Sequence, residues 1–110
     1  MWKEKLARYD QLIAQHPAIE RKGKTMPYTS VNGHMFSQLN KDGQVGLRLG
    51  ADDRAAFLKQ YNTVLFSAYG AVMKEYVLVT EEVLSDDDLF APYLAKSYAY
   101  VQSLKPKKGK

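Results

Sequence analysis

Two histidines, His16 and His34, are the side chains of this sequence best suited to proton transfer at neutral pH. Nucleophilic catalysis needs such a base beside an activated serine, threonine or cysteine, yet the chain has no cysteine and no G-x-S-x-G turn around a serine. His16 ends a helical stripe and His34 opens a strand after a turn, so position in the fold explains each histidine. We therefore expect a protein that is not an enzyme, with no catalytic residue to assign.

The densest group of carboxylates, at residues 81–88, has two glutamates followed by Asp86, Asp87 and Asp88. A calcium loop needs the spacing D-x-D-x-D-G followed by a glutamate, and this segment does not have it. Ser85 followed by three aspartates is instead typical of a helix start, because carboxylates are stabilised near the positive end of the helix dipole. Since the glycine-rich phosphate-binding motifs are also missing from the sequence, we expect neither a metal nor a cofactor.

Positive charge is concentrated at the two ends of the chain. Residues 1–24 carry six Lys or Arg against three Asp or Glu, residues 25–104 carry six against nine, and residues 105–110 carry four against none. Nucleic-acid binding requires positive charge gathered on one surface, so a weak nucleic-acid contact through the two ends is one hypothesis. The candidate residues for this contact are Arg21, Lys22, Lys24, Lys105, Lys107, Lys108 and Lys110. Residues 105–110 are expected to form a disordered basic tail, and the competing interpretation is that this tail is only solubilising.

Aromatic side chains are numerous, with eight tyrosines and four phenylalanines. The aromatic motif of RNA-binding sheets is missing, so we assign most of these rings to the core. Tyr93, Tyr98 and Tyr100 cannot all lie on one stripe of a helix, and we expect at least one of them at the surface. Tyrosine is enriched at protein interfaces, so these three are the candidate residues of a partner surface.

Hydrophobic periodicity predicts the elements that would position these residues. Apolar residues at steps of three and four from Trp2 to His16 predict a helix that ends before Pro17. Three strands follow, near residues 24–31, 34–40 and 44–49, with Asn32-Gly33 as a two-residue hairpin turn. Pro27 cannot donate to a strand ladder, so the first strand is either an edge strand or begins after this residue.

The second half of the chain is also expected to contain both helices and strands. A short helix follows Gly50, and strands are expected at residues 63–67 and 75–80 with residues 68–74 as a loop between them. Ser85 is expected to cap the last helix, whose buried face holds Phe90, Leu94, Ser97, Tyr98 and Val101. Because proline removes a helical hydrogen bond, the main part of this helix is expected to restart with Pro92 in its opening turn.

This order predicts an α+β fold, a two-layer sandwich in which an antiparallel sheet of about five strands carries helices on one face. The element order is α-β-β-β-α-β-β-α. A single domain spans residues 1–104, since 110 residues are enough for one core but not for two. The N-terminus has no apolar stretch of a signal peptide and the chain has no run of about 18 apolar residues, so we expect no membrane association and a cytoplasmic location.

Several segments of the sequence resemble the TfoX N-terminal domain family. These segments are Val31–Phe36, Gln44–Arg54, Gly70–Val77 and Tyr98–Lys107, and together they extend the resemblance over nearly the whole chain. The Met-Phe-Gly-Gly motif of the family is replaced here by Met26-Pro27-Tyr28-Thr29. The resemblance implies the element order given above and a link to the regulation of natural competence in bacteria. The family's regulators carry a second, C-terminal domain, and this chain resembles the N-terminal domain alone.

Our hypothesis from the sequence is a small bacterial interaction or regulatory module that binds another protein. The two strands of the second half and the last helix are the expected partner surface, and edge strands could also pair two copies into a homodimer. Two alternatives stay open. One is a nucleic-acid-contacting protein that uses the basic termini, and the other is a small-ligand-binding protein or unrecognised enzyme with a pocket between sheet and helices.

Overall fold

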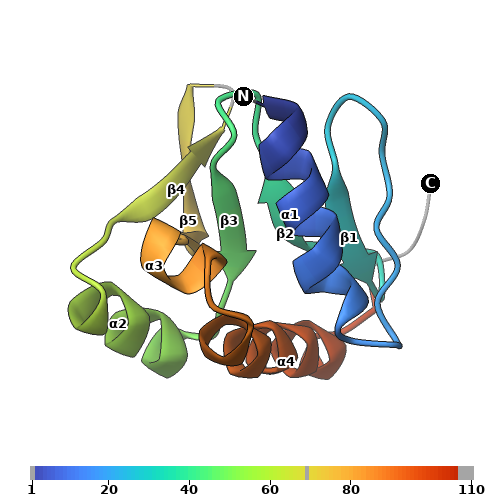
Figure 1. Cartoon of the computed structure of the whole chain (residues 1–110). Coiled ribbons are helices and arrows are strands. Elements are labelled where there is room, and N and C mark those ends of the chain that lie inside the picture. Colours follow the sequence, from blue (N-terminus) through green and yellow to red (C-terminus); the bar gives the residue numbers. More distant parts are fainter. Residues whose placement is uncertain (1, 69, 107–110) are drawn as a thin grey trace.

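The chain is built around one five-stranded antiparallel sheet (Figure 1). A computed structural model describes residues 2–68 and 70–106. In these residues the strand order across the sheet is β1-β2-β3-β5-β4, and every neighbouring pair is antiparallel. The strands are β1 (Tyr28–Val31), β2 (His34–Leu39), β3 (Val45–Arg48), β4 (Leu65–Ala68) and β5 (Ala71–Leu78).

Helices cover one face of this sheet, with α1 lying across it and α4 closing one end (Figure 1). The helices are α1 (Trp2–Ala14), α2 (Ala51–Gln60), α3 (Glu81–Leu84) and α4 (Asp87–Ser103). The predicted α+β class is confirmed, and the predicted element order holds apart from the short α3, which was not expected. None of the helices in the described residues combines the length and the apolar character that crossing a lipid bilayer requires.

The acidic run at residues 81–88 forms two helix starts. The Thr80 hydroxyl accepts a hydrogen bond from the Val83 backbone N–H at 3.4 Å and begins α3. One oxygen of the Asp86 carboxylate accepts from the N–H groups of Asp88 and Leu89 and begins α4. The expected cap, Ser85, is instead the residue that follows and caps the C-terminal end of α3, and its hydroxyl donates to the Glu82 carbonyl. The prediction of Ser85 as the cap was therefore wrong by one residue, because α3 uses it first.

Pro92 does not interrupt α4. The expected restart at Pro92 was wrong, since the helix runs continuously and Pro92 is its sixth residue. A proline at this position leaves the Asp88 carbonyl without its helical donor. Asp88 and Pro92 are both exposed, so water can reach this end of the helix. The buried face of α4 then follows as predicted, with Phe90, Leu94, Ser97 and Val101 buried.

Two of the turns between strands contain a glycine with a positive φ angle. Asn32 and Gly33 have φ angles of 56° and 78° and form the predicted turn between β1 and β2. Between β4 and β5 the expected loop over residues 68–74 was wrong, because β5 begins at Ala71. Gly70 has a φ of 76°, a conformation that glycine adopts without steric cost, and the chain can therefore reverse at once. At the other end of the sheet, β1 is an edge strand and also begins after Pro27.

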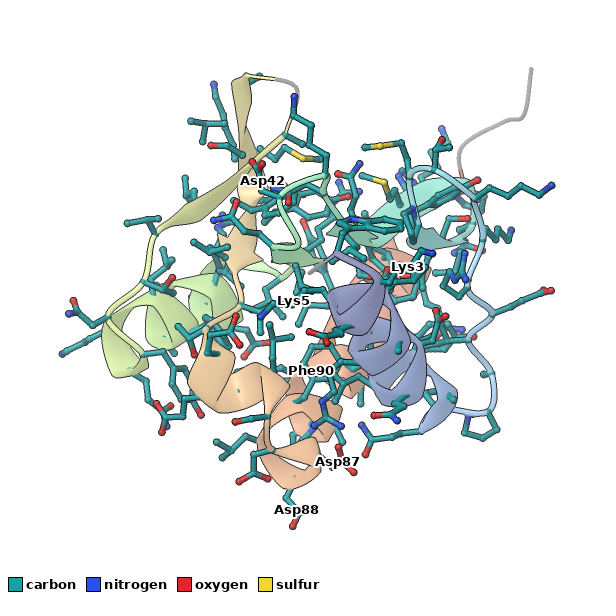
Figure 2. The ribbon with its side chains drawn as sticks, turned by 45° about the horizontal axis from the view of Figure 1, so that its top comes forward. Lys3, Lys5, Asp42, Asp87, Asp88 and Phe90 are labelled. Atoms are coloured by element: carbon teal, nitrogen blue, oxygen red, sulfur yellow. The ribbon has the colours of Figure 1, made fainter. Side chains whose placement is uncertain are left out.

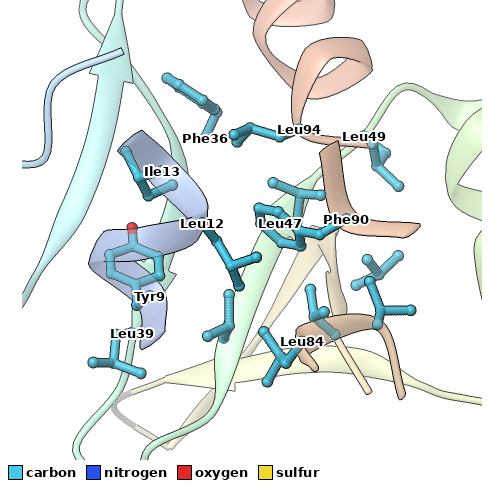
Figure 3. Close-up of a cluster of buried hydrophobic side chains, with 14 of the residues drawn as sticks. Tyr9, Leu12, Ile13, Phe36, Leu39, Leu47, Leu49, Leu84, Phe90 and Leu94 are labelled. Carbon is cyan, nitrogen blue, oxygen red and sulfur yellow. The ribbon is translucent and has the colours of Figure 1, made fainter. Parts of the chain in front are cut away.

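The main core lies between the sheet and the helices (Figure 3). Figure 3 shows Leu12 of α1, Leu47 of β3 and Phe90 of α4 converging on one another. A chain of hydrogen-bonded hydroxyls lies within this layer, where the hydroxyl oxygens of Tyr9 and Ser37 are 2.7 Å apart. Ser37 in turn meets the Thr29 hydroxyl at 2.6 Å. Burial raises the pKa of Tyr9 above its ordinary value, so this hydroxyl stays protonated and ties α1 to β1 and β2.

A second, smaller cluster covers part of the opposite face of the sheet. Phe66 of β4, Ala68 and Tyr76 of β5 are buried in it, and Met35 and Met73 pack against them. Phe66 lies directly on Gly46 of β3, where a Cβ atom would be 2.3 Å from the ring. The β4–β5 hairpin therefore curls over the face that the helices leave open, because Gly46 gives the ring room to approach the backbone.

Candidate interaction surface

The strand β4 is one edge of the sheet, and its own segment of the chain carries no charge, although Lys41 and Asp42 of the turn between β2 and β3 line a hollow beside Ser67. Among the described strands its only neighbour is β5. Residues 60–73 contain no Lys, Arg, Asp or Glu. Two large hydrophobic residues of the described chain are exposed near this edge: Val64, which keeps 64% of its surface, directly precedes β4, and Val72 of β5, which keeps 59%, is the register partner of Ser67. Proteins commonly protect edge strands with charges, prolines or covering segments, and β4 has no charge and no proline.

The opposite edge, β1, is protected. Lys22 forms an isolated bridge with Tyr28, in which the Lys22 N–H donates to the Tyr28 carbonyl at 2.8 Å and the Tyr28 N–H donates back at 2.9 Å. Pro27 precedes the strand and has no N–H to donate to a partner. Register irregularity does not separate the two edges, because the β1–β2 and β4–β5 pairings each have one. The two edges therefore differ in physical character, and β4 is the edge that another extended strand can approach.

Hydrogen bonds show which backbone groups β4 presents. The Leu78 N–H donates to the Val64 carbonyl at 2.9 Å, so residue 64 faces β5. Backbone groups alternate in direction along a strand, which turns those of Leu65 and Ser67 toward the open edge. The Asn40 side chain donates to the Ser67 carbonyl at 3.3 Å. The N–H and carbonyl of Leu65 and the N–H of Ser67 are thus the groups that a partner strand would meet.

The three tyrosines proposed as a partner surface do not come together. All three are half-buried, and each packs in a different place. Tyr93 meets the edge of the Phe57 ring at 4.9 Å. Tyr98 lies against His16 at 4.9 Å and Phe36 at 5.8 Å, measured between ring centroids. Their different directions around α4 thus place these rings in separate contacts.

Tyr100 belongs to a polar cluster at the end of β3 and β5. Its hydroxyl donates to one Glu75 oxygen at 3.2 Å, while the Arg48 Nε donates to the other at 2.7 Å. The Arg48 guanidinium also lies 5.9 Å from the centroid of the Tyr100 ring. Burial alone would raise the pKa of the Glu75 carboxyl, but the hydrogen bond and charge of Arg48, with the Tyr100 hydroxyl, hold this pKa below its ordinary value.

The basic candidate residues differ in how much charge they present. Arg21 is paired with Asp10, with Nε 2.7 Å from one carboxylate oxygen and a terminal nitrogen 3.1 Å from the other. Lys22 reaches the Ser30 hydroxyl at 3.5 Å, and Lys24 is exposed. Lys105 is exposed too. Lys107, Lys108 and Lys110 lie outside the described residues, which include only residues 105 and 106 of the expected tail.

The histidines occupy the ordinary positions expected from the sequence. His34 Nε2 is hydrogen-bonded to the Lys105 carbonyl at 2.9 Å, and the Asn32 side chain donates to the Gln102 carbonyl at 3.1 Å. These two bonds attach the end of α4 to the turn between β1 and β2. His16 Nδ1 accepts from the Ala18 N–H at 3.3 Å, just after α1 ends. Each histidine ring is thus hydrogen-bonded to a backbone group, His16 within the segment after α1 and His34 to the segment after α4.

A hollow of about 260 Å³ lies between α1 and α3. Two ion pairs line or border it, Lys5 with Glu81 at 2.6 Å and Arg8 with Asp87 at 2.8 Å. Figure 2 shows Lys5 and Asp87 on facing sides of this junction. The ligand hypothesis placed its pocket between sheet and helices, and this hollow lies in that region. Its charged groups pair with one another and hold α1 against α3 and α4.

The open β4 edge was expected only in outline, as part of a surface formed by two strands and a helix. Val64 and Val72 were not singled out, although the uncharged run over residues 60–73 was the available signal. Comparison of the chain with models of known families, with curated proteins and with solved structures found no match.

Proposed function

We propose that this chain is a non-enzymatic interaction module that binds an extended segment of another protein along β4. The observation that carries the proposal is the contrast between the two edges of the sheet. The β1 edge is covered by the bridge at Lys22, whereas the β4 segment itself is uncharged and has the exposed Val64 and Val72 near it. A partner strand would extend the sheet through main-chain hydrogen bonds to Leu65 and Ser67.

The chemistry of the edge specifies the kind of segment that binds. A charged residue opposite Leu65 would lose water without gaining an opposite charge, because residues 60–73 carry none, whereas Lys41 and Asp42 line the hollow beside Ser67. The favoured segment is therefore extended, weakly polar and apolar at alternate positions. The resemblance to the TfoX N-terminal domain family supports a regulatory role for this binding in a bacterial cell. Natural competence is the process that the resemblance suggests.

Site-specific photo-crosslinking tests the proposal directly. A photoreactive amino acid is placed at Val64 or Val72, and at Ala95 on the exposed side of α4 as a matched control. After irradiation in cells, the proposal expects a protein adduct from the first two positions and none from the control. The adduct should disappear when Val64→Lys or Val72→Lys is introduced at the other position, since an ammonium at the edge opposes strand pairing. Equal adducts from all three positions, or none from the edge, would refute it.

A second candidate, a weak nucleic-acid contact, is favoured by one tertiary feature. The Lys22 ammonium lies at Ser30 of β1, and the Lys105 backbone is bonded to His34 of β2. Two basic segments far apart in sequence thus reach the same hairpin. We expect this contact to weaken steeply with salt and to be lost when residues 105–110 are removed. Salt-insensitive binding, or binding unchanged by the truncation, would contradict this candidate.

A further inference from the structure

Trp2, the single tryptophan, lies at the rim of a shallow hollow at one end of the sheet. The hollow measures about 270 Å³ and is lined by Trp2, Lys24, Thr25 and Lys41. These residues come from three separate segments, namely the start of α1, the chain before β1 and the turn between β2 and β3. The N-terminal end of α1 and the strand turns meet at the top of Figure 1. The indole is held in place because its N–H donates to the Asn40 carbonyl at 3.0 Å.

Positive charge is presented around this indole. Lys24 and Lys41 are exposed, and neither has an ion-pair partner among the described residues. Lys3, the residue after Trp2, is exposed as well. The carboxylate of Asp42 follows Lys41 in the same turn and reduces the positive potential there. In Figure 2, Lys3 and Asp42 lie on the two sides of the N-terminal end of α1.

Seven of the twelve acidic residues lie elsewhere in the fold, whereas Glu4, two residues after Trp2, and Asp42, next to Lys41, are neighbours in sequence of the residues that line the hollow. Two aspartates stand in the first turn of α2, two glutamates in α3, and three aspartates at the start of α4. Figure 2 shows Asp87 and Asp88 at the lower end of the molecule, away from Lys3. An anionic ligand would therefore be repelled by the helix end and oriented toward the hollow at Trp2.

We propose that the hollow at Trp2 binds a nucleotide unit of a single-stranded nucleic acid, with the base on the indole and the flanking phosphates at Lys24 and Lys41. Single-strand sites combine aromatic rings that stack on bases with cations that follow the backbone. An acidic peptide would use the lysines but leave the indole without a stacking partner. A second hollow of about 540 Å³ shares Lys41, but the Asp42 carboxylate and Ser67 of β4 also line it, so the proposed site is the hollow at Trp2 alone.

The inference goes beyond the protein interaction proposed above, because it uses the end of the sheet at Trp2 and not the β4 edge. It also differs from the contact proposed for the basic termini. In that contact Lys105 and the chain end are essential, whereas here Trp2 and Lys41 carry the binding. Lys24 is shared by both sets, so the test has to separate Lys41 from the tail.

The test uses the full chain and a fluorescein-labelled oligomer of about twelve thymidines. Anisotropy measures binding as sodium chloride is raised, and Trp2 emission reports the indole itself, since the chain has one tryptophan. We expect the oligomer to quench Trp2 at low salt. A Lys24→Gln/Lys41→Gln variant should bind at least tenfold more weakly and lose about 1.4 from the salt slope, since each phosphate contact to a single strand contributes about 0.7. Trp2→Leu should weaken binding about tenfold while leaving that slope unchanged.

A matched variant, Lys59→Gln/Lys96→Gln, lowers the net charge equally on α2 and α4 and should leave binding within about twofold. Circular dichroism of each variant confirms that the fold is retained. Three results would each overturn the inference: no binding at low salt, binding without quenching of Trp2, or equal losses from the two lysine pairs. Complete loss of binding on removing residues 105–110 would overturn it too and favour the basic termini.

Discussion

Replacing Gly46 with alanine tests the packing that curls the β4–β5 hairpin over the sheet. Gly46 lies in β3, and its backbone conformation is one that other residues adopt, because its φ is outside the positive range. In such a position Gly→Ala alone would stabilise a strand by about 0.5–1 kcal/mol, since glycine loses more conformational freedom on folding. Here the new Cβ would lie 2.3, 2.4 and 2.7 Å from three atoms of the Phe66 ring. The expected effect therefore changes sign.

The size of the loss follows from how little room Phe66 has. The ring is completely buried among Ala68, Tyr76 and the methionines beside them. Adding a methyl group to a filled cluster costs about 1–3 kcal/mol. After subtracting the gain in backbone entropy, we expect Gly46→Ala to lower the free energy of unfolding by about 0.5–2 kcal/mol. The hairpin would have to lift away from β3 to relieve the clash.

Urea unfolding followed by circular dichroism measures this loss, and a double-mutant cycle identifies its cause. Phe66→Leu removes the ring, so Gly46→Ala in that background should cost at least 1 kcal/mol less than in the wild-type chain. Gly50→Ala is the comparison, because its Cβ would meet the half-buried Tyr100 ring at 3.1 Å, a looser approach than that at Gly46. We expect a change within about 0.5 kcal/mol there. A stabilising Gly46→Ala, or additive effects of the two substitutions, would refute the reasoning.

Two further predictions concern polar groups. Asn40→Ala should lower the free energy of unfolding by about 2–3 kcal/mol, because this buried amide accepts from the N–H groups of Asp42 and Gln44 and donates to Ser67; a loss under about 0.5 kcal/mol in urea would contradict it. Glu75→Gln should destabilise the chain at neutral pH and cease to matter at low pH. The Glu75 pKa is lowered on folding from its ordinary 4.5, so the carboxylate contributes stability above that value, and the contribution is lost as the pH falls through the folded pKa. Unfolding curves between pH 7 and pH 2 check this, with the exposed Glu82→Gln as control, and equal pH dependence in both variants would speak against it.

Much of the fold could be predicted because its signals are local. The stripe from Trp2, the Asn32-Gly33 turn and the aspartates before α4 each act within a few residues of one another. The predictions that were wrong concerned element boundaries, which neighbouring residues determined. Ser85 caps the C-terminal end of α3 and not the start of α4, and Gly70 closes a turn where a loop was expected.

The candidate sites could be predicted less well, because contacts distant in sequence decide them. Arg21 was assigned to a basic surface, but Asp10 pairs with it across the end of α1. Lys41 was passed over because its own segment is acidic, and only the approach of Lys24 and Trp2 makes it part of a positive hollow. The exposed edge of β4 depends in the same way on strand order, which is a property of the whole sheet.

The sequence by itself determined the class of this protein: an α+β sheet with its helices on one face, and no cysteine for disulfide or thiolate chemistry. Propensity, turn residues and apolar spacing suffice for that, because each acts between neighbours in the chain. Only the tertiary structure decided that β4 is the open edge and that lysines surround Trp2. Strand order, and which charged side chains lie near one another, depend on packing between segments that are distant in sequence. A local sequence pattern does not specify which of those segments come into contact.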